Sequence, residues 1–247
     1  MIARRVAEGL AEYGLISPMD AVLAPDETLA PARTLSLYCD LLLRGNEKMN
    51  LTAITDPEQV AELYMLDCAA LLTVADFSGQ PAVIDVGTGA GFPGLVLKVL
   101  EPGIRLTLLD SLGKRVEWLS QVAPFLGAPD VACIHGRGEE QAHHPALRDH
   151  FDFAVSRAVA ELSLLTELCL PFVKVGGKFL AMKGPDCQGE LEAAGRAISL
   201  LGGQVCPPVP YRIPGTELRR QVVVVEKVSP TPKGYPRRYA RMKKKPL

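Results

Sequence analysis

The residues best suited to bind a ligand form a glycine-rich block that runs from Asp85 to Gly91. It reads Asp-Val-Gly-Thr-Gly-Ala-Gly and lies between an apolar run, residues 82–84, and an apolar segment, residues 92–100. A strand, a glycine turn and a helix in this order form a nucleotide-binding corner, because glycines allow positive φ and close approach of a ligand. The start of the helix adds unpaired N–H groups. The candidate ligand-binding residues here are Asp85, Gly87, Thr88, Gly89, Gly91 and Phe92.

The spacing of the glycines indicates which nucleotide would bind. Dinucleotide-binding folds use the pattern G-x-G-x-x-G, whose last two glycines serve a pyrophosphate and close helix packing. Here the third glycine, Gly91, comes one residue early, and Phe92 takes the dinucleotide position. The carboxylate of Asp85 before the turn favours a ligand with a cationic end. S-adenosylmethionine carries an ammonium and a sulfonium but no phosphate. The block therefore predicts this cofactor, with S-adenosylhomocysteine as the product, over NAD.

Polar residues also follow the strands expected further along the chain, where the carboxyl ends of an open α/β sheet bind ligands. They are Asp110, Gly138, Glu139, Ser156, Arg157 and Lys183. Asp110 comes 23 residues after Gly87, and a carboxylate there can accept hydrogen bonds from both ribose hydroxyls. Glu139 or nearby backbone can contact the amino edge of adenine. Arg157 has three open roles: it could hold the cofactor carboxylate, contact the substrate, or pair with a surface acid.

The segment after the fourth expected strand indicates the kind of methyl acceptor. Methyltransferases for exocyclic amines carry an Asn/Asp-Pro-Pro-aromatic loop there, and those that attack carbon use a cysteine, often in Pro-Cys. Residues 155–159 read Val-Ser-Arg-Ala-Val, which is neither. An acceptor that needs no base fits this pattern. Guanine N7 has a free lone pair, so its methylation depends on alignment with the methyl–sulfur bond, and carboxylates would stabilise the cationic product.

Composition limits the class of protein. The 247 residues are 48% hydrophobic and 22% charged, which is typical of a soluble globular protein. No apolar run approaches the roughly 18 residues of a membrane span, and the N-terminus lacks the apolar region of a secretory signal. The six cysteines are scattered without a C-x-x-C pair, so we expect reduced thiols in the cytoplasm. His143 and His144 have no third ligand at helical spacing, so we expect no metal site.

The charge of the chain is unevenly distributed. The net charge is −1, but residues 227–247 hold eight basic residues and no acidic one, which leaves 19 basic against 28 acidic residues elsewhere. Such a tail is either a solvated segment or an arm that contacts phosphates. An acidic body with one basic arm fits a protein that binds a polyanion at one place. The candidate RNA-binding residues are Arg115, Arg237, Arg238, Arg241, Lys243, Lys244 and Lys245.

The chain divides into three parts: a helical region at 1–78, an S-adenosylmethionine-binding domain at 79–228, and a flexible basic tail at 229–247. Apolar residues recur every three or four positions in the first part. The expected helices cover 2–13, 29–44 and 57–74, the last with Asp56 as N-cap and Pro57 at its first position.

From residue 82 onward, expected strands and helices alternate. The expected strands are 82–86, 105–109, 131–134, 151–155, 178–182, 204–212 and 219–228; the helices between them are 92–100, 112–125, 162–173 and 189–201. We expect Gly176 and Gly177 to end the helix at 162–173. The alternation predicts an α/β fold with a doubly wound, mostly parallel sheet. The last two strands have no helix between them, so they predict a hairpin and an antiparallel closing strand, as in Rossmann-like class I methyltransferases.

Several blocks of the sequence resemble one known family. They are Asn50-Leu51-Thr52, Leu66-Asp67, the segment from Asp85 to Gly94, the segment from Leu108 to Arg115, Gly138-Glu139-Glu140, Ser156-Arg157-Ala158 and Lys183-Gly184. They span about residues 45–230, and the Asp-Ser-Leu-Gly-Lys-Arg block is more specific than the glycine turn. With them the chain resembles the RsmG (GidB) family of bacterial 16S rRNA guanine-N7 methyltransferases.

The resemblance implies methyl transfer from S-adenosylmethionine to N7 of one guanine in 16S rRNA, with naked rRNA or the small ribosomal subunit as partner. It implies cofactor contacts near Gly87, Phe92, Gly138, Glu139 and Arg157, and it includes Ser111 in the matching block. It also places Asn50 near the RNA-facing mouth. The resulting positioning candidates are Arg157, Ser156, Lys183 and Asn50.

Two positions depart from the family pattern. Members often carry Trp where this chain has Gly45, and His where it has Tyr64. We expect a monomer.

Three alternatives remain at this point. An NAD-dependent dehydrogenase would also place a carboxylate on the ribose. A methyltransferase for a small molecule would need no basic tail. A non-catalytic RNA-binding protein could keep the fold, but the intact Asp85 and Asp110 around the glycine turn argue against it.

Overall fold

One eight-stranded sheet organises the chain, in the order β3-β2-β1-β4-β5-β8-β6, with β7 also paired to β8. The computed structural model describes residues 1–17, 30–157 and 160–247, so the expected helix start at Leu29 and Ala158 of the family block lie outside the described residues. The strands are β1 (Ala82–Val86), β2 (Arg105–Asp110), β3 (Ala132–His135), β4 (Phe151–Arg157), β5 (Val173–Lys183), β6 (Gly203–Val205), β7 (Val209–Arg212) and β8 (Arg219–Lys227).

The sheet has the expected mixture of directions. β1 pairs in parallel with β2 and β4, β2 with β3, and β4 with β5, whereas β8 runs antiparallel to β5. All five residues of β1 are buried, as expected for a central strand of an apolar run covered on both faces. The predicted α/β fold with a mostly parallel sheet and an antiparallel closing strand is confirmed.

Most expected strands lie within two residues of the observed bounds, and two expectations differ more. The segment 204–212 forms two strands, because Pro207 and Pro208 lack the N–H that would continue the ladder. Both pieces pair with β8, at Val205–Val225 and Val209–Val222.

β5 begins at Val173, so the expectation that Gly176 and Gly177 end the preceding helix is wrong. A Cβ on Gly177 would lie 2.6 Å from the carbonyl oxygen of Asp152, so the glycine at this position permits close contact between β5 and β4.

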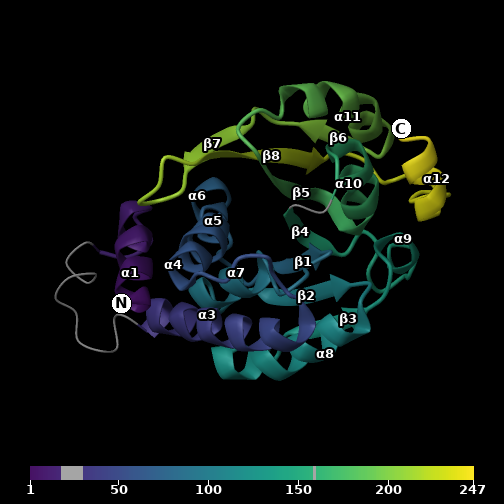
Figure 1. Ribbon diagram of the computed structural model, residues 1–247. Helices are drawn as coiled ribbons and strands as arrows, with labels where there is room; N and C mark the ends of the chain where they lie inside the picture. The colour runs from purple at the N-terminus through teal and green to yellow at the C-terminus, as the bar shows by residue number, and fades with distance from the viewer. Residues whose placement is uncertain (18–29, 158–159) are drawn as a thin grey trace.

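Helices cover both faces of the sheet (Figure 1). They are α1 (Ile2–Glu12), α3 (Ala30–Met49), α4 (Pro57–Val60), the π-helical segment η1 (Ala61–Leu66), α5 (Asp67–Ala69), α6 (Leu71–Val74), α7 (Gly94–Leu100), α8 (Gly113–Val122), the 3-10 turn η2 (Ala123–Leu126), α9 (Gly138–Gln141), α10 (Leu162–Cys169), the 3-10 turn η3 (Leu170–Phe172), α11 (Gln188–Leu200) and α12 (Tyr239–Lys244). The N-cap predicted at Asp56 is confirmed, since its carboxylate accepts a hydrogen bond from Gln59 N.

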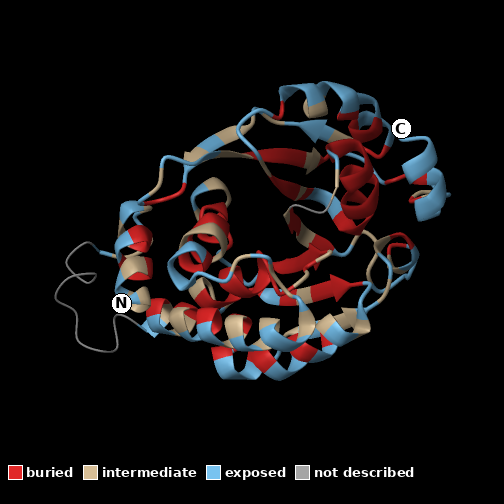
Figure 2. Ribbon diagram, in the orientation of Figure 1, coloured by how far each residue is buried: buried red, intermediate tan, exposed pale blue. Residues whose placement is uncertain are grey.

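Two hydrophobic cores fill the space between sheet and helices. One contains residues of α1, α3, α7 and α8 together with one face of the sheet, and the other contains α10, α11 and the opposite face. The N-terminal helices therefore share a core with the sheet. Figure 2 shows the result: red central strands and a red α10, with pale blue on the outer faces of α3 and α11. Every residue of α10 is buried.

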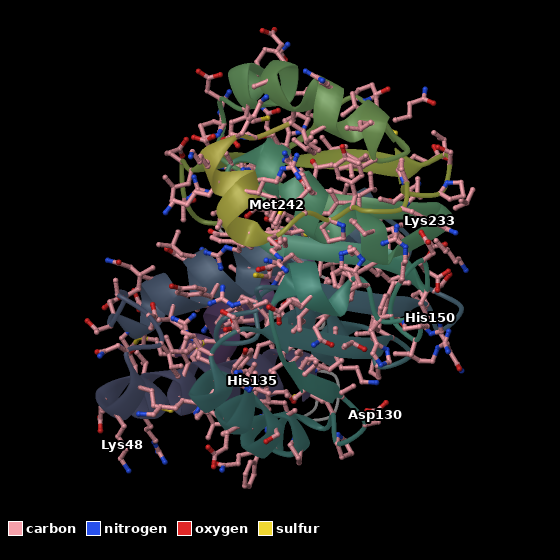
Figure 3. The ribbon with its side chains drawn as sticks, turned by 90° about the vertical axis from the view of Figure 1, so that its right-hand side faces the viewer. Lys48, Asp130, His135, His150, Lys233 and Met242 are labelled. Carbon is pink, nitrogen blue, oxygen red and sulfur yellow. The ribbon has the colours of Figure 1, made fainter. Side chains whose placement is uncertain are left out.

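The C-terminal segment is folded against the domain rather than flexible, contrary to the expectation from its composition. Met242 of α12 is fully buried in the second core. Arg237 pairs with the buried Glu167 of α10 at 2.6 Å. In Figure 3, Met242 on the yellow helix and His135 at the end of β3 lie on one side of the view. Asp130 and His150, which precede β3 and β4, lie on the other side. The tail thus lies at the carboxyl edge of the sheet.

Candidate functional site

Two cavities lie side by side at the carboxyl ends of the strands. The first, of about 430 Å³, is lined by Leu51, Tyr64, Gly87, Thr88, Gly89, Ala90, Phe92, Asp110, Ser111, Leu112, Arg115 and Arg157. The second, of about 250 Å³, is lined by Val86, Gly87, Leu109, Asp110, Ser111, Gly136, Arg137, Gly138, Glu139, Leu168 and Tyr239. Gly87, Asp110 and Ser111 belong to both. The two spaces therefore meet where β1 and β2 end.

The glycine turn forms the floor between these cavities. Gly87, Gly89 and Gly91 have φ of 72°, 61° and 97°, which strongly favour glycine. The turn is tied to β2, since Gly87 N and Thr88 N both donate to the carbonyl oxygen of Leu109. Gly91 also allows the Tyr38 hydroxyl to reach the carbonyl of Ala90. Hydrogen bonds to β2 and to Tyr38 thus fix the shape of the turn, which lines both cavities.

Asp85 lies beneath this turn and lines neither cavity. Its Oδ2 accepts hydrogen bonds from the Thr88 hydroxyl at 2.7 Å and from Gly94 N at 2.8 Å. Its Oδ1 is buried and has no hydrogen-bond partner among the described residues. Burial raises the pKa of Asp85 to about 7. An unsatisfied carboxylate oxygen in this position suits a cationic ligand, because a nearby positive charge offsets its cost of burial.

Asp110 stands where the two cavities join. It is 5% exposed, and its two oxygens accept backbone N–H bonds from Gly89 and Leu112, both at 2.9 Å. Each oxygen retains a second lone pair, which can accept a hydroxyl hydrogen. Arg115 Nη1 is 4.0 Å from Asp110 Oδ2 and lines the first cavity. The carboxylate is therefore fixed in orientation and still able to bind a diol.

Arg157 forms part of the wall of the first cavity and contacts one distant segment of the chain, residues 64–68. Its Nε pairs with Asp67 at 3.2 Å, and its guanidinium lies 4.6 Å from the centre of the Tyr64 ring. Tyr211 of β7 donates a hydrogen bond to the same Asp67 at 2.7 Å. Burial raises the pKa of Asp67, and Arg157 and Tyr211 partly offset that rise. Among the described residues Arg157 Nη2 has no hydrogen-bond partner, so it remains a free donor.

Aromatic rings continue this wall. Phe92 stacks on Tyr38 with ring centres 5.0 Å apart and contacts Tyr64 at 4.7 Å. The Tyr64 hydroxyl is 2.7 Å from the Thr52 hydroxyl, and Thr52 N binds the side chain of Asn46. The segment after α3 thereby reaches the cavity through Tyr64. Gly45, the other departure from the family pattern, leaves room for Trp118, whose Nε1 would be 2.7 Å from a Cβ.

The structure brings most of the predicted ligand-binding residues to the two cavities, but not all. Ser156 is fully buried, and its hydroxyl donates to the carbonyl of Val86, so it ties β4 to β1. Lys183 lines a third cavity with Asp67 and Arg157, and its ammonium pairs with Glu190 at 2.6 Å. Asn50 is exposed, and its neighbour Leu51 lines the first cavity instead.

The tail residues split into two groups. Arg237 is 11% exposed and donates to Glu167, so the expectation that it is free to contact phosphates is wrong: its charge is used inside the fold. The other basic residues predicted there are exposed, namely Arg238, Arg241, Lys243, Lys244 and Lys245.

Several lining residues had no signal in the sequence as site residues. Tyr64 and Asp67 contact Arg157 across 93 and 90 residues, and Tyr211 contacts Asp67 across 144 residues. Tyr239 reaches the second cavity from the tail. The sequence offered two hints: Asp67 belongs to a family block, and Tyr64 stands where family members often carry His.

A larger cavity lies elsewhere but lacks this chemistry. It measures about 530 Å³ and is lined by Asp76, Gln80, Arg105, Asp152 and Lys174 among others, at the amino ends of the strands. Parallel α/β sheets bind ligands at the other edge. Within the described residues there is no group of three or more His, Cys, Asp or Glu side chains that could hold a metal ion, and no helix long and apolar enough to cross a membrane.

The sheet order, its antiparallel β8 and the glycine turn after β1 define a class I methyltransferase fold. Solved structures share this fold. A mutant MtNAS in complex with S-adenosylmethionine aligns over 90% of this chain and 83% of its own, at 17% identity and a TM-score of 0.53. The YcgJ protein from Bacillus subtilis covers 66% of this chain and 98% of its own, at 16% identity and a TM-score of 0.50.

Sequence comparison defines the family. The profile of GidB, described as rRNA small subunit methyltransferase G, matches residues 32–210. A protein named ribosomal RNA small subunit methyltransferase G from Alkaliphilus metalliredigens is 47% identical over 210 residues, 85% of this chain and 88% of its own. The protein of that name from Symbiobacterium thermophilum is 44% identical over 244 residues, 97% of both chains. The chain belongs to this family, which confirms the methyltransferase prediction over the dehydrogenase alternative.

Proposed function

We propose that this protein transfers a methyl group from S-adenosylmethionine to N7 of one guanine in 16S rRNA, acting on the rRNA or on the small ribosomal subunit. The observation that carries the proposal is the junction of the two cavities at Asp110. An adenosine needs a flat pocket for its base and an acceptor for its ribose diol, and it needs no phosphate site. The second cavity, Asp110 and the short glycine turn offer this combination.

The residues present fit this cofactor. In the proposal Gly138 and Glu139 contact the adenine, Asp110 and Ser111 bind the ribose, and the methionine part occupies the first cavity beside Thr88 and Gly89. Asp85 supplies a negative charge beneath the turn for the cationic end. When bound, the cofactor supplies an electrophilic methyl group on a sulfonium.

The protein's own part in the reaction is positioning. Guanine N7 has no proton to lose, so the site needs no general base, and alignment of the acceptor supplies the rate acceleration. In the proposal Arg157, fixed by Asp67 and Tyr64, directs its free Nη2 toward guanine O6, while Phe92 and Tyr64 provide apolar surface for the base. The charge that develops on the guanine ring is stabilised by the buried carboxylates.

The basic residues at the same edge supply the phosphate contacts in this proposal. Arg115 lies at the mouth of the first cavity, and the exposed residues of the tail lie beyond the second one. Asn50, next to the lining residue Leu51, and Lys183, which lines the third cavity with Arg157, remain candidates for positioning the RNA. Ser156 acts through the hydrogen bond that ties β4 to β1.

Mass spectrometry of nucleosides tests the proposal directly. Small subunits and naked 16S rRNA from a strain that lacks the corresponding enzyme are incubated with the protein and S-adenosylmethionine, then digested. We expect one new 7-methylguanosine per rRNA, and it should form much more slowly with Asp110→Ala protein when S-adenosylmethionine is below saturation. A methyl group on another base, on the exocyclic amine or on a small molecule only would contradict the proposal.

A further inference from the structure

The C-terminal segment forms part of the wall of the second cavity, and hydrogen bonds to the rest of the domain fix its position there. Tyr239, the first residue of α12, lines this cavity together with Leu168 of α10 and with Gly138 and Glu139 of α9. In Figure 1 the yellow α12 lies next to α9. The helix α12 begins 29 residues after residue 210, where the match to the family profile ends.

Three side chains of the domain hold the tail in place. Glu167 accepts hydrogen bonds from the backbone N, Nε and Nη2 of Arg237, at 2.8, 2.8 and 2.6 Å. Arg148 donates to the carbonyl oxygens of Tyr235 and Thr231, both at 2.8 Å. A ring nitrogen of His143 is 2.9 Å from the carbonyl oxygen of Pro236. Breaking the Arg237–Glu167 pair would leave a carboxylate uncompensated in the core, so this anchor is strongly maintained.

The orientation of α12 buries its apolar residue and exposes its basic residues. Met242 is buried in the core, and Arg241, Lys243 and Lys244 are exposed, while Tyr239 is 37% exposed at the edge of the cavity. Among the described residues the Tyr239 hydroxyl makes no hydrogen bond, so no hydrogen bond of that hydroxyl fixes the ring at the cavity. A half-exposed aromatic ring beside an adenine-sized cavity is typical of a stacking surface for a base.

We propose that Tyr239 is a cofactor-binding residue that packs against the adenine ring, and that the Arg237–Glu167 pair is the element that positions it. The inference rests on the proposed placement of the adenosine in the second cavity. The tail then has a second role beside phosphate contact. The Tyr239 ring that contacts the cofactor and the exposed basic side chains that contact phosphates belong to the same short helix, α12. Cofactor binding and the docking of the tail then stabilise each other, since thermodynamic linkage is reciprocal.

Calorimetric titration of S-adenosylhomocysteine into the full-length protein, without RNA, tests the assignment. We expect Tyr239→Ala to weaken binding roughly tenfold, from the loss of one base–aromatic contact. Tyr239→Phe keeps the ring, and Arg241→Ala removes an exposed charge from the same helix; each should stay within about twofold of the parent. Thermal unfolding checks that all variants are folded.

A second readout follows the tail itself. The exposed basic residues of α12 are trypsin sites, so S-adenosylhomocysteine should slow cleavage after Arg241 in the parent and do so much less in Tyr239→Ala. A dissociation constant for Tyr239→Ala within twofold of the parent would overturn the inference. If Asp110→Ala still weakens binding in that case, the pocket assignment survives and only the role of the tail fails; if neither variant weakens it, both fail. Neither result depends on rRNA methylation.

Discussion

Two aspartates at the ends of adjacent strands have different environments. Asp110 has both oxygens bound to backbone N–H groups and lines the two cavities, so its negative charge is stabilised and accessible. Asp85 is fully buried with one oxygen unsatisfied. We infer that Asp110 contributes directional hydrogen bonds to the cofactor, whereas Asp85 shapes the turn and contributes charge.

Replacing Asp110 with Ala should weaken the binding of S-adenosylhomocysteine about 10- to 100-fold. The loss of one or two hydrogen bonds to a charged acceptor costs about 1.5–3 kcal/mol, and each 1.4 kcal/mol corresponds to a factor of ten. Isothermal titration calorimetry measures the change. Asp186→Ala, which removes an exposed aspartate elsewhere, is the matched control. Equal affinities for Asp110→Ala and this control would exclude Asp110 from the site.

The raised pKa of Asp85 predicts a pH dependence of cofactor binding. Burial raises this pKa to about 7, and a cationic ligand favours the ionised form. Affinity for S-adenosylmethionine should therefore increase as the pH rises through about 7, with proton release on binding. Asp85→Asn keeps an acceptor for Thr88 and Gly94 but cannot ionise, so its affinity should be lower and nearly constant between pH 6 and pH 8. A parent protein whose affinity is flat over this range would contradict the argument.

Asp85 also predicts how the stability of the folded protein depends on pH. Its pKa is higher in the folded state than in the unfolded state, so its stabilising contribution is present at low pH and is lost as the pH rises from about 4 to about 7. Without ligand, Asp85→Asn should therefore unfold at a higher temperature than the parent at pH 8, and the difference should shrink at pH 5. Differential scanning calorimetry measures both. A larger difference at pH 5 than at pH 8 would have the wrong sign.

At the scale of elements, the helical segment from Pro57 to Val74 delivers the least expected site residues. Its middle, Ala61–Leu66, is π-helical, a geometry often found at functional sites. This segment carries Tyr64, and Asp67 follows it directly. The start of the segment is fixed by the Asp56 cap and Pro57. The wall around Arg157 thus depends on where this helix begins.

Asp56→Ala should destabilise the protein by about 1 kcal/mol, because one N–H of the first helical turn loses its partner. Urea unfolding would show a lower midpoint with an unchanged slope. Asp56→Ser keeps an oxygen acceptor at the cap and should retain most of the parent stability. Equal losses in the two variants would mean that the cap does not stabilise this helix.

The sequence predicted the elements well where an apolar run ends at residues that break a strand or helix, such as glycine. β1 is found at the predicted bounds, since an apolar run ends at the glycine turn. The prediction missed the break between β6 and β7, although Pro207 and Pro208 are a local signal for it. It also missed the early start of β5, because that start is decided by pairing with β4. Asp110 was predictable from its strand end, but the partners of Arg157 were not, because tertiary contacts alone bring them together.

At the scale of the whole molecule, the fold divides the basic tail between structure and surface. Of the eight basic residues at 227–247, Lys227 at the end of β8 is fully buried and Arg237 is paired with Glu167. Five of the others form an exposed positive group at the carboxyl edge of an acidic domain: Arg238, Arg241, Lys243, Lys244 and Lys245. Deleting the tail would also expose the core around Met242, so substitution of charges is the sharper experiment.

Exchanging the three lysines at 243–245 for glutamine should weaken RNA binding and flatten its salt dependence. Each contact between a basic residue and a phosphate of single-stranded RNA contributes about 0.7 to the slope of log K against log salt, so the slope should fall by up to about 2. Affinity for S-adenosylhomocysteine should not change, because these side chains are exposed and line neither cavity. The matched control removes three positive charges remote from the site: Arg105, Lys174 and Arg196. Filter binding from 50 to 300 mM salt measures the slope of log K against log salt for both variants. If the two slopes are equal, RNA affinity depends on the net charge of the protein alone and the tail is not a binding arm.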